Sequence, residues 1–153
     1  MRIKHTRWWG SLWAIGAAAV TLALAVQHRR AERRESSAEA LEALRREVVR
    51  PDADAGTWRR LARALEGAGN IPHALEAWQR AVDLDPFNVE GRAGWAKALA
   101  RVAAHQELEH LLSEWVILDA PSALRFLSRA DANIASLPSY RKLLAEARSQ
   151  AVD

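Results

Sequence analysis

The strongest constraint on the fold is a pattern of large and small apolar residues between positions 58 and 86. Large side chains alternate with small ones at helical spacing, and the set comprises Trp58, Leu61, Ala62, Leu65, Ala74, Trp78 and Ala81. Gly69-Asn70 interrupts the pattern and Pro86 ends it. Small residues let two helices approach closely, and large ones fill the space between them. The pattern therefore predicts a pair of packed helices joined by a short turn.

This spacing resembles the tetratricopeptide repeat (TPR), whose signature is W-x2-L-G-x2-Y, then A-x3-F, then P. Eight positions fall at the family's spacing when the repeat begins at Ala55, and Ala62, Leu65 and Trp78 are conservative replacements. A shift of 34 residues gives a second, weaker repeat, with Arg92 in place of the usual Trp. The resemblance implies an all-α solenoid with repeats 55–88 and 89–122.

Helical segments flank the two repeats, and residues 38–153 are predicted to form one TPR-like domain. Segment 38–50 is expected to cap one end, with Ser36 or Ser37 as its N-cap. Segment 123–151 is expected to cap the other end as helices 123–135 and 139–151, separated by Ser136-Leu137-Pro138.

In the second repeat, helix 106–118 is expected to turn five residues inward, namely Leu108, Leu111, Leu112, Trp115 and Leu118. Trp115 occupies a position where the family has a small residue. We therefore expect irregular stacking beyond this helix.

The N-terminal segment contains nineteen residues without a charge, from Trp8 to Val26, with Lys and Arg on both sides. About twenty apolar residues in a helix span a membrane, and Trp8, Trp9 and Trp13 gather at one end, as aromatic residues do at membrane interfaces. We predict a basic tail at 1–7, a transmembrane helix at 8–27 and a charged linker or helical continuation at 28–37. A cleaved signal peptide, with Ala23-Leu24-Ala25 as its cleavage site, and a buried core helix are the alternatives.

The segment's export-like form favours the inner (cytoplasmic) membrane as the location, with a single span and the repeat domain in the periplasm. Lys and Arg are nearly balanced across the span, so the positive-inside rule does not decide the orientation.

Charge and composition exclude several function classes. Residues 1–35 hold seven Lys/Arg against two Glu, and residues 36–153 hold fifteen Lys/Arg against seventeen Asp/Glu. The net charge of +3 therefore comes from the N-terminal segment, and nucleic acid is not an expected partner of the domain. The sequence has no cysteine, which excludes disulfides and thiolate metal sites.

No catalytic or cofactor motif is present in the sequence. His105 and Glu109 share a helix face, but no third ligand accompanies them. We therefore expect no enzyme activity, no metal and no cofactor.

The resemblance implies a concave groove lined by the first helix of each repeat. Mapped onto this sequence, the groove residues are Arg59, Arg63, Glu66, Ala93, Lys97 and Arg101. Four cations on one face would suit an acidic segment or a peptide C-terminus of a protein partner. The alternative is that they are solvated charges paired with Glu66 and Glu90. The Asn residues of carboxylate-clamp TPRs are missing from these positions.

The expected function is a membrane-anchored TPR scaffold or assembly factor for protein–protein interaction. The layout, with "ALEALRREVVRPDADAGTWRRLARAL" after the anchor, is similar to membrane-anchored TPR proteins of bacterial cytochrome c maturation. The alternative is an accessory structural subunit of a membrane complex. In that case Gly10, Gly16 and the Ala17-Ala18-Ala19 run would pack against other transmembrane subunits.

Overall fold

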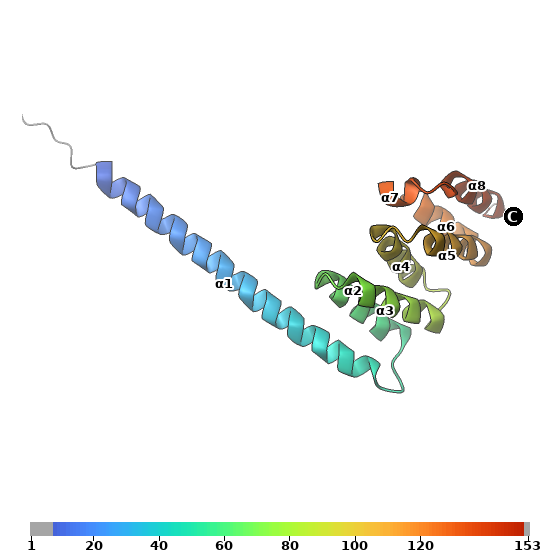
Figure 1. Ribbon diagram of the computed structural model, residues 1–153, viewed down its shortest axis with the longest axis horizontal. Helices are drawn as coiled ribbons and strands as arrows, with labels where there is room; N and C mark the ends of the chain where they lie inside the picture. Colours follow the sequence, from blue (N-terminus) through green and yellow to red (C-terminus); the bar gives the residue numbers. More distant parts are fainter. Residues whose placement is uncertain (1–7, 152–153) are drawn as a thin grey trace, which may run out of the picture. The chain divides into compact units, whose positions relative to one another are not determined.

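The computed structural model describes the backbone of residues 8–151 and the side chains of residues 22–151 (Figure 1). This part of the chain holds eight α-helices and no strand, which confirms the predicted all-α class. The helices are α1 (Trp8–Val48), α2 (Ala55–Gly67), α3 (Ile71–Leu84), α4 (Val89–Arg101), α5 (His105–Leu118), α6 (Ala120–Leu127), α7 (Ala132–Ala135) and α8 (Tyr140–Gln150). The chain divides into two compact units, residues 1–40 and 41–153.

Helix α1 extends from the first unit into the start of the second and ends at Val48. Ser36 and Ser37 lie inside it, where their hydroxyls donate to the carbonyl oxygens of Arg33 (3.0 Å) and Arg34 (2.9 Å). The prediction that one of these serines caps a new helix was wrong. No Gly or Pro lies between Val26 and Val48, so no residue of the two types that most disfavour a helix interior interrupts the helix.

The predicted transmembrane helix 8–27 falls largely on residues 8–21, whose side chains lie outside the described part of the chain. The same holds for Trp8, Trp9 and Trp13, and the basic tail 1–7 lies entirely outside it. Among the residues that the structure does describe, no helix combines the length and the apolar character needed to cross a membrane.

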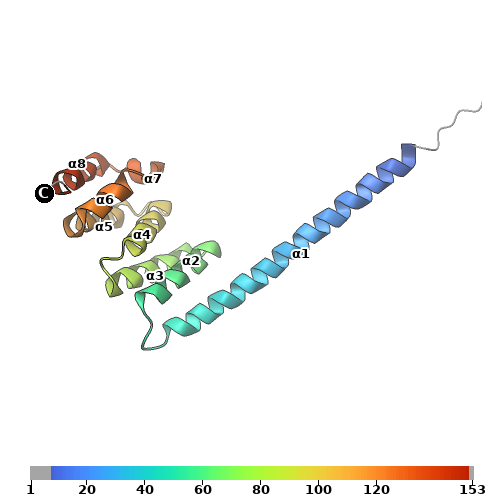
Figure 2. The same cartoon turned by 180° about the vertical axis from the view of Figure 1, so that it is seen from behind.

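The second unit contains the predicted helix pair, now seen as α2 and α3 (Figure 2). The predicted core positions are confirmed, because six of them are at most 5% exposed: Leu61, Ala62, Leu65, Ala74, Trp78 and Ala81. Trp58 is only half-buried and packs at the edge of this core. Gly69 makes the turn with a positive φ of 78°, a conformation that glycine adopts without steric cost.

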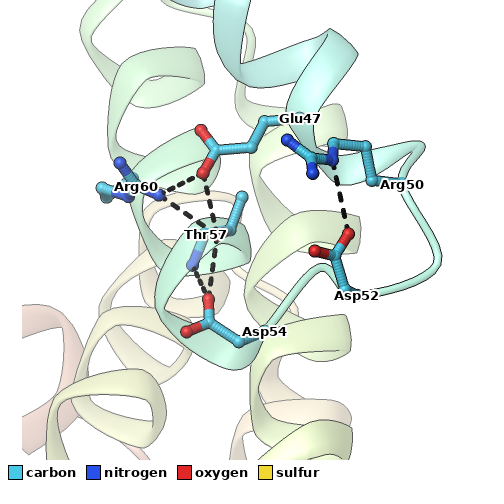
Figure 3. A network of polar contacts seen from close by, with 6 residues as sticks. All are labelled: Glu47, Arg50, Asp52, Asp54, Thr57 and Arg60. Carbon is cyan, nitrogen blue, oxygen red and sulfur yellow. Dashed lines mark hydrogen bonds and ion pairs between the residues drawn. The ribbon is translucent and has the colours of Figure 1, made fainter.

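The end of α1 packs on α2 and α3 through Leu41, Leu44 and Val48. A polar network joins the same elements (Figure 3): Arg60 donates to Glu47 Oε1 at 2.7 Å and to the hydroxyl of Thr57 at 3.1 Å. Thr57 in turn donates its backbone N–H (2.7 Å) and its hydroxyl (2.8 Å) to Asp54 Oδ1. These two bonds lower the pKa of the N-cap carboxyl of Asp54. The start of α2 is therefore fixed to the end of α1.

From α4 to α8 the helices surround a second apolar core that includes Leu108, Leu112 and Trp115. The rings of Trp115 and Phe126 lie 4.9 Å apart, and the hydroxyl of Tyr140 donates to the carbonyl oxygen of Leu127 at 2.8 Å. Four of the five predicted inward residues of α5 are buried. Leu118 is 46% exposed, so that prediction was wrong. It is the last residue of α5, and the chain enters α6 directly after Asp119.

The predicted helix 123–135 is two short helices, α6 and α7. Asp119 caps α6 by accepting from the N–H of Ser122 at 3.2 Å, so α6 begins three residues earlier than predicted. Asp131 caps α7 by accepting from the N–H groups of Asn133 and Ile134, both at 3.1 Å. Asp131 therefore divides the predicted helix, because an aspartate N-cap begins a new one. Helix α8 packs on both α5 and α6; the irregular stacking expected after Trp115 stays a prediction.

The turn between α4 and α5 contains a strained residue. Ala103 has φ of 55° and stands 34 residues after Gly69, which makes the corresponding turn. The Cβ of an L-residue is crowded in this conformation.

We predict that Ala103→Gly raises the free energy of unfolding by about 0.5–1 kcal/mol. The matched control, Gly69→Ala, should lower it by about 1 kcal/mol. Urea unfolding of the full chain, followed by circular dichroism, measures both; a destabilised Ala103→Gly variant contradicts the strain.

Gly94 lies against the indole ring of Trp78. A Cβ at this position would overlap the six-membered ring of Trp78. We predict that Gly94→Ala lowers the free energy of unfolding by about 1–3 kcal/mol through overpacking, although alanine favours a helix more than glycine does.

Gly67 provides the control, since it is also helical and a Cβ there would meet no atom within 4 Å. Gly67→Ala should leave stability unchanged or raise it by less than about 1 kcal/mol. Trp78→Leu should make the added methyl of Gly94→Ala less costly in the double variant. Equal effects of the two glycine substitutions would show that the contact is unimportant.

Candidate functional site

Two of the predicted groove cations are paired with a carboxylate. Glu90, in the first turn of α4, reaches back to α2: its Oε2 lies 3.5 Å from Arg59 Nε, and its Oε1 forms an ion pair with Arg63. The pairing with Glu90 that the sequence left open is the arrangement observed. Because one carboxylate is shared by two guanidinium groups, this part of the face offers a partner less positive potential than the sequence indicates.

The side chain of Glu66 makes a contact within the domain. Its Oε1 lies 3.3 Å from Nε1 of the buried Trp78 and accepts a hydrogen bond from it. A buried indole N–H needs such an acceptor. The role that the structure gives Glu66 is to support the core.

Lys97 lines a hollow of about 510 Å³ formed by α4, α6, α7 and the turn between the last two. Two further cations line it, Arg125 on α6 and Arg129 just after it. Apolar side chains of Val89, Phe126 and Ile134 complete its wall. We call this cavity the basic hollow, after its three cations, Lys97, Arg125 and Arg129.

The other predicted positions on α4 lie elsewhere. Ala93 is half-buried and packs against the second core. Arg101 is exposed in the last turn of α4 and does not line the basic hollow. Lys97 therefore lines the basic hollow with Arg125 and Arg129, and none of the other predicted groove residues lines it.

Arg125 and Arg129 escaped the sequence analysis because segment 123–151 was interpreted only as a cap. A signal for them was present: the two are four residues apart, so they would share a face of any helix that contained both. A second signal is Asp119-Ala120-Pro121, because Asp followed by Pro two residues later is typical of a helix N-terminus. It indicates the start of the helix that carries Arg125.

The basic hollow carries more positive than negative charge. Within the described residues, no carboxylate forms an ion pair with Lys97, Arg125 or Arg129. Arg125 Nη2 donates to Ser122 Oγ at 2.7 Å, which orients its guanidinium. Asp131 also lines the hollow, but its Oδ1 already accepts the two N–H groups that begin α7. The arrangement suits an anionic group next to an apolar one.

Metal-ligating residues do not gather in this part of the molecule. The residues that the structure describes include no group of three His, Cys, Asp or Glu side chains that could hold a metal ion. Glu109, which shares a helix face with His105, accepts a hydrogen bond from Ser139 Oγ at 2.7 Å.

Comparison with models of known protein families returns no match, and comparison with curated proteins returns none either. The TPR resemblance therefore stays a prediction.

Proposed function

We propose that the chain is a membrane-anchored TPR scaffold or assembly factor that holds an acidic, C-terminal segment of a protein partner in the basic hollow. The observation that carries this proposal is the set of three cations, Lys97, Arg125 and Arg129, beside an apolar wall. The proposal names a binding module, in agreement with the absence of catalytic motifs from the sequence.

The chemistry of the hollow favours a carboxylate ligand. Hydrogen bonds between a guanidinium or ammonium group and a carboxylate are stronger than those between neutral groups. The volume of about 510 Å³ accommodates a few residues of a peptide, and the side chains of Phe126 and Ile134 favour an apolar residue beside the charge. A C-terminal Leu or Phe combines a carboxylate with an apolar side chain in one residue.

The anchor is the second part of the proposal. The uncharged run from Trp8 to Val26 supports a single span in the inner membrane. Its export-like form supports a periplasmic position of the helical domain. Tethering would confine the hollow to the membrane surface and raise its effective concentration for membrane-bound partners.

A narrower form of the proposal is a role in cytochrome c maturation, which the layout of anchor and repeats supports. In that form the ligand is the C-terminus of an apocytochrome. Calorimetry with such peptides distinguishes it from the general proposal, since binding of other acidic C-termini alone removes only the narrower form.

We predict that the full chain in detergent binds a fluorescent ten-residue peptide with Asp, Glu and a free C-terminal Leu. Lys97→Glu with Arg129→Glu should weaken binding at least tenfold, measured by fluorescence anisotropy, because two attractions become repulsions. Both side chains are exposed, so the fold should persist.

The control is Arg80→Glu with Arg148→Glu, which changes the net charge equally at two exposed sites outside the hollow. A C-terminally amidated Gln/Ser peptide with the same Leu should bind weakly to every variant. If the two double variants lose affinity for the acidic peptide equally, the change in net charge explains the loss, and the position of the charges does not matter. If the unaltered chain does not bind the acidic peptide, an acidic C-terminal segment is not its ligand. The remaining candidate function is then an accessory structural subunit of a membrane complex.

A further inference from the structure

A second hollow, of about 710 Å³, lies between α3, α4 and α5. Arg92 and Trp95 of α4 line it, together with Asp83 of α3 and Glu114, Ile117 and Leu118 of α5. The basic hollow also uses α4, but through Val89 and Lys97 on another face of the helix. None of the residues named for the basic hollow lines this one.

Arg92 is the unusual member of this group. It stands 34 residues after Trp58, at a position where the first repeat has an apolar side chain, and it is 4% exposed. Its Nε donates to the carbonyl oxygen of Pro86. Burial lowers the pKa of its guanidinium, while Glu114 and then Asp119 act in the opposite direction.

One of its nitrogen atoms lacks a partner. Across residues 22–151, Arg92 Nη1 is the one buried side-chain nitrogen or oxygen without a hydrogen bond. Buried polar groups in native proteins are nearly always paired, and an unpaired one is destabilising. Because this atom is shielded from solvent, a ligand's acceptor removes the cost when the Arg92 side chain turns toward the hollow.

The rest of the hollow specifies the ligand further. Ile117 is 76% exposed and Leu118 is 46% exposed, and Trp95 beside them is half-buried. Asp83 and Glu114 add two exposed carboxylates, whereas the one Arg of the lining is buried. His110 Nε2 lies 3.4 Å from Glu114 Oε1 and is a weak competitor for it, because both side chains are more than half exposed. The accessible charge is therefore negative.

We propose that this hollow binds a peptide segment that carries Lys or Arg next to an apolar residue. The apolar side chain packs on Ile117, Leu118 and Trp95, and the cation pairs with Asp83 and Glu114. A backbone carbonyl of the segment accepts a hydrogen bond from Arg92. This ligand is opposite in charge to that of the basic hollow, so the chain can hold two different segments at once. The inference goes beyond the proposed function and does not depend on it.

The test uses the full chain in nanodiscs of phosphatidylcholine, with empty nanodiscs as the blank. The probes are end-blocked, fluorescent octapeptides of alternating Leu and Lys, Leu and Gln, or Leu and Glu. The Leu/Lys peptide should bind at least tenfold more tightly than the Leu/Glu peptide. Asp83→Lys with Glu114→Lys should reverse this order. Asp52→Lys with Glu107→Lys, two exposed carboxylates outside the hollow, should preserve it.

Two further variants separate the contacts. Arg92→Met keeps an apolar stem but removes the donors; it should weaken the Leu/Lys peptide, although the loss of a positive charge alone would tighten it. Ile117→Ser changes a side chain that is 76% exposed, so the fold should persist while binding falls at least fivefold. Lys97→Glu with Arg129→Glu should leave the affinity for the Leu/Lys peptide unchanged, which shows that this peptide does not occupy the basic hollow.

Equal affinity for the three peptides, or unchanged binding in both the Asp83/Glu114 and the Ile117 variants, overturns the proposal. So does concentration-dependent dimerisation that Ile117→Ser abolishes, since a second copy of the chain would then be the occupant.

Discussion

The contact between the indole ring of Trp78 and the backbone of Gly94 sets how closely α3 and α4 approach. Trp78 is 2% exposed, and no side chain larger than hydrogen fits opposite its six-membered ring. Its N–H is held by Glu66 of α2, so one residue joins three helices. The end of α1 also packs against the apolar core that contains Trp78.

Both hollows depend on the position of α4 that this contact fixes. One side of α4 presents Lys97 to α6 and α7, and another presents Arg92 and Trp95 to α3 and α5. If α4 shifted along α3, Lys97 would be displaced along with Arg92 and Trp95, because all three belong to α4. The two proposed ligands thus differ in charge, while the helix that positions their contacts is shared.

Local pattern predicted much of the fold. The spacing of Trp58, Leu61 and Leu65 was sufficient to place α2, because apolar periodicity and a glycine turn are both local properties of the chain. The same reasoning failed at Leu118 and at the break between α6 and α7. There the outcome depends on which aspartate caps a helix and on how the last helices pack, and neither follows from periodicity.

The candidate site was harder to predict than the fold. Sequence spacing placed Arg59 and Arg63 on one helix face and left their pairing with Glu90 open. Glu90 comes from the next helix pair, so only the packing of the helices decides that pairing. Arg125 joins Lys97 for the same reason, through contact between helices. Arg92 was recognised as an exception to the repeat, and only the structure shows that it is buried with an unpaired nitrogen. Which charges neutralise one another is a property of tertiary contacts.

The central claim is that a partner's acidic segment occupies the basic hollow at the membrane. Site-specific photo-crosslinking in native membranes tests it most directly, with a photoreactive residue at position 97 or, as the matched position on α2, at 63. We predict an adduct from position 97 that maps to an acidic or C-terminal segment of another protein, and little adduct from position 63. An adduct from position 63 but not from 97, or a crosslinked segment without acidic residues or a C-terminus, would contradict it.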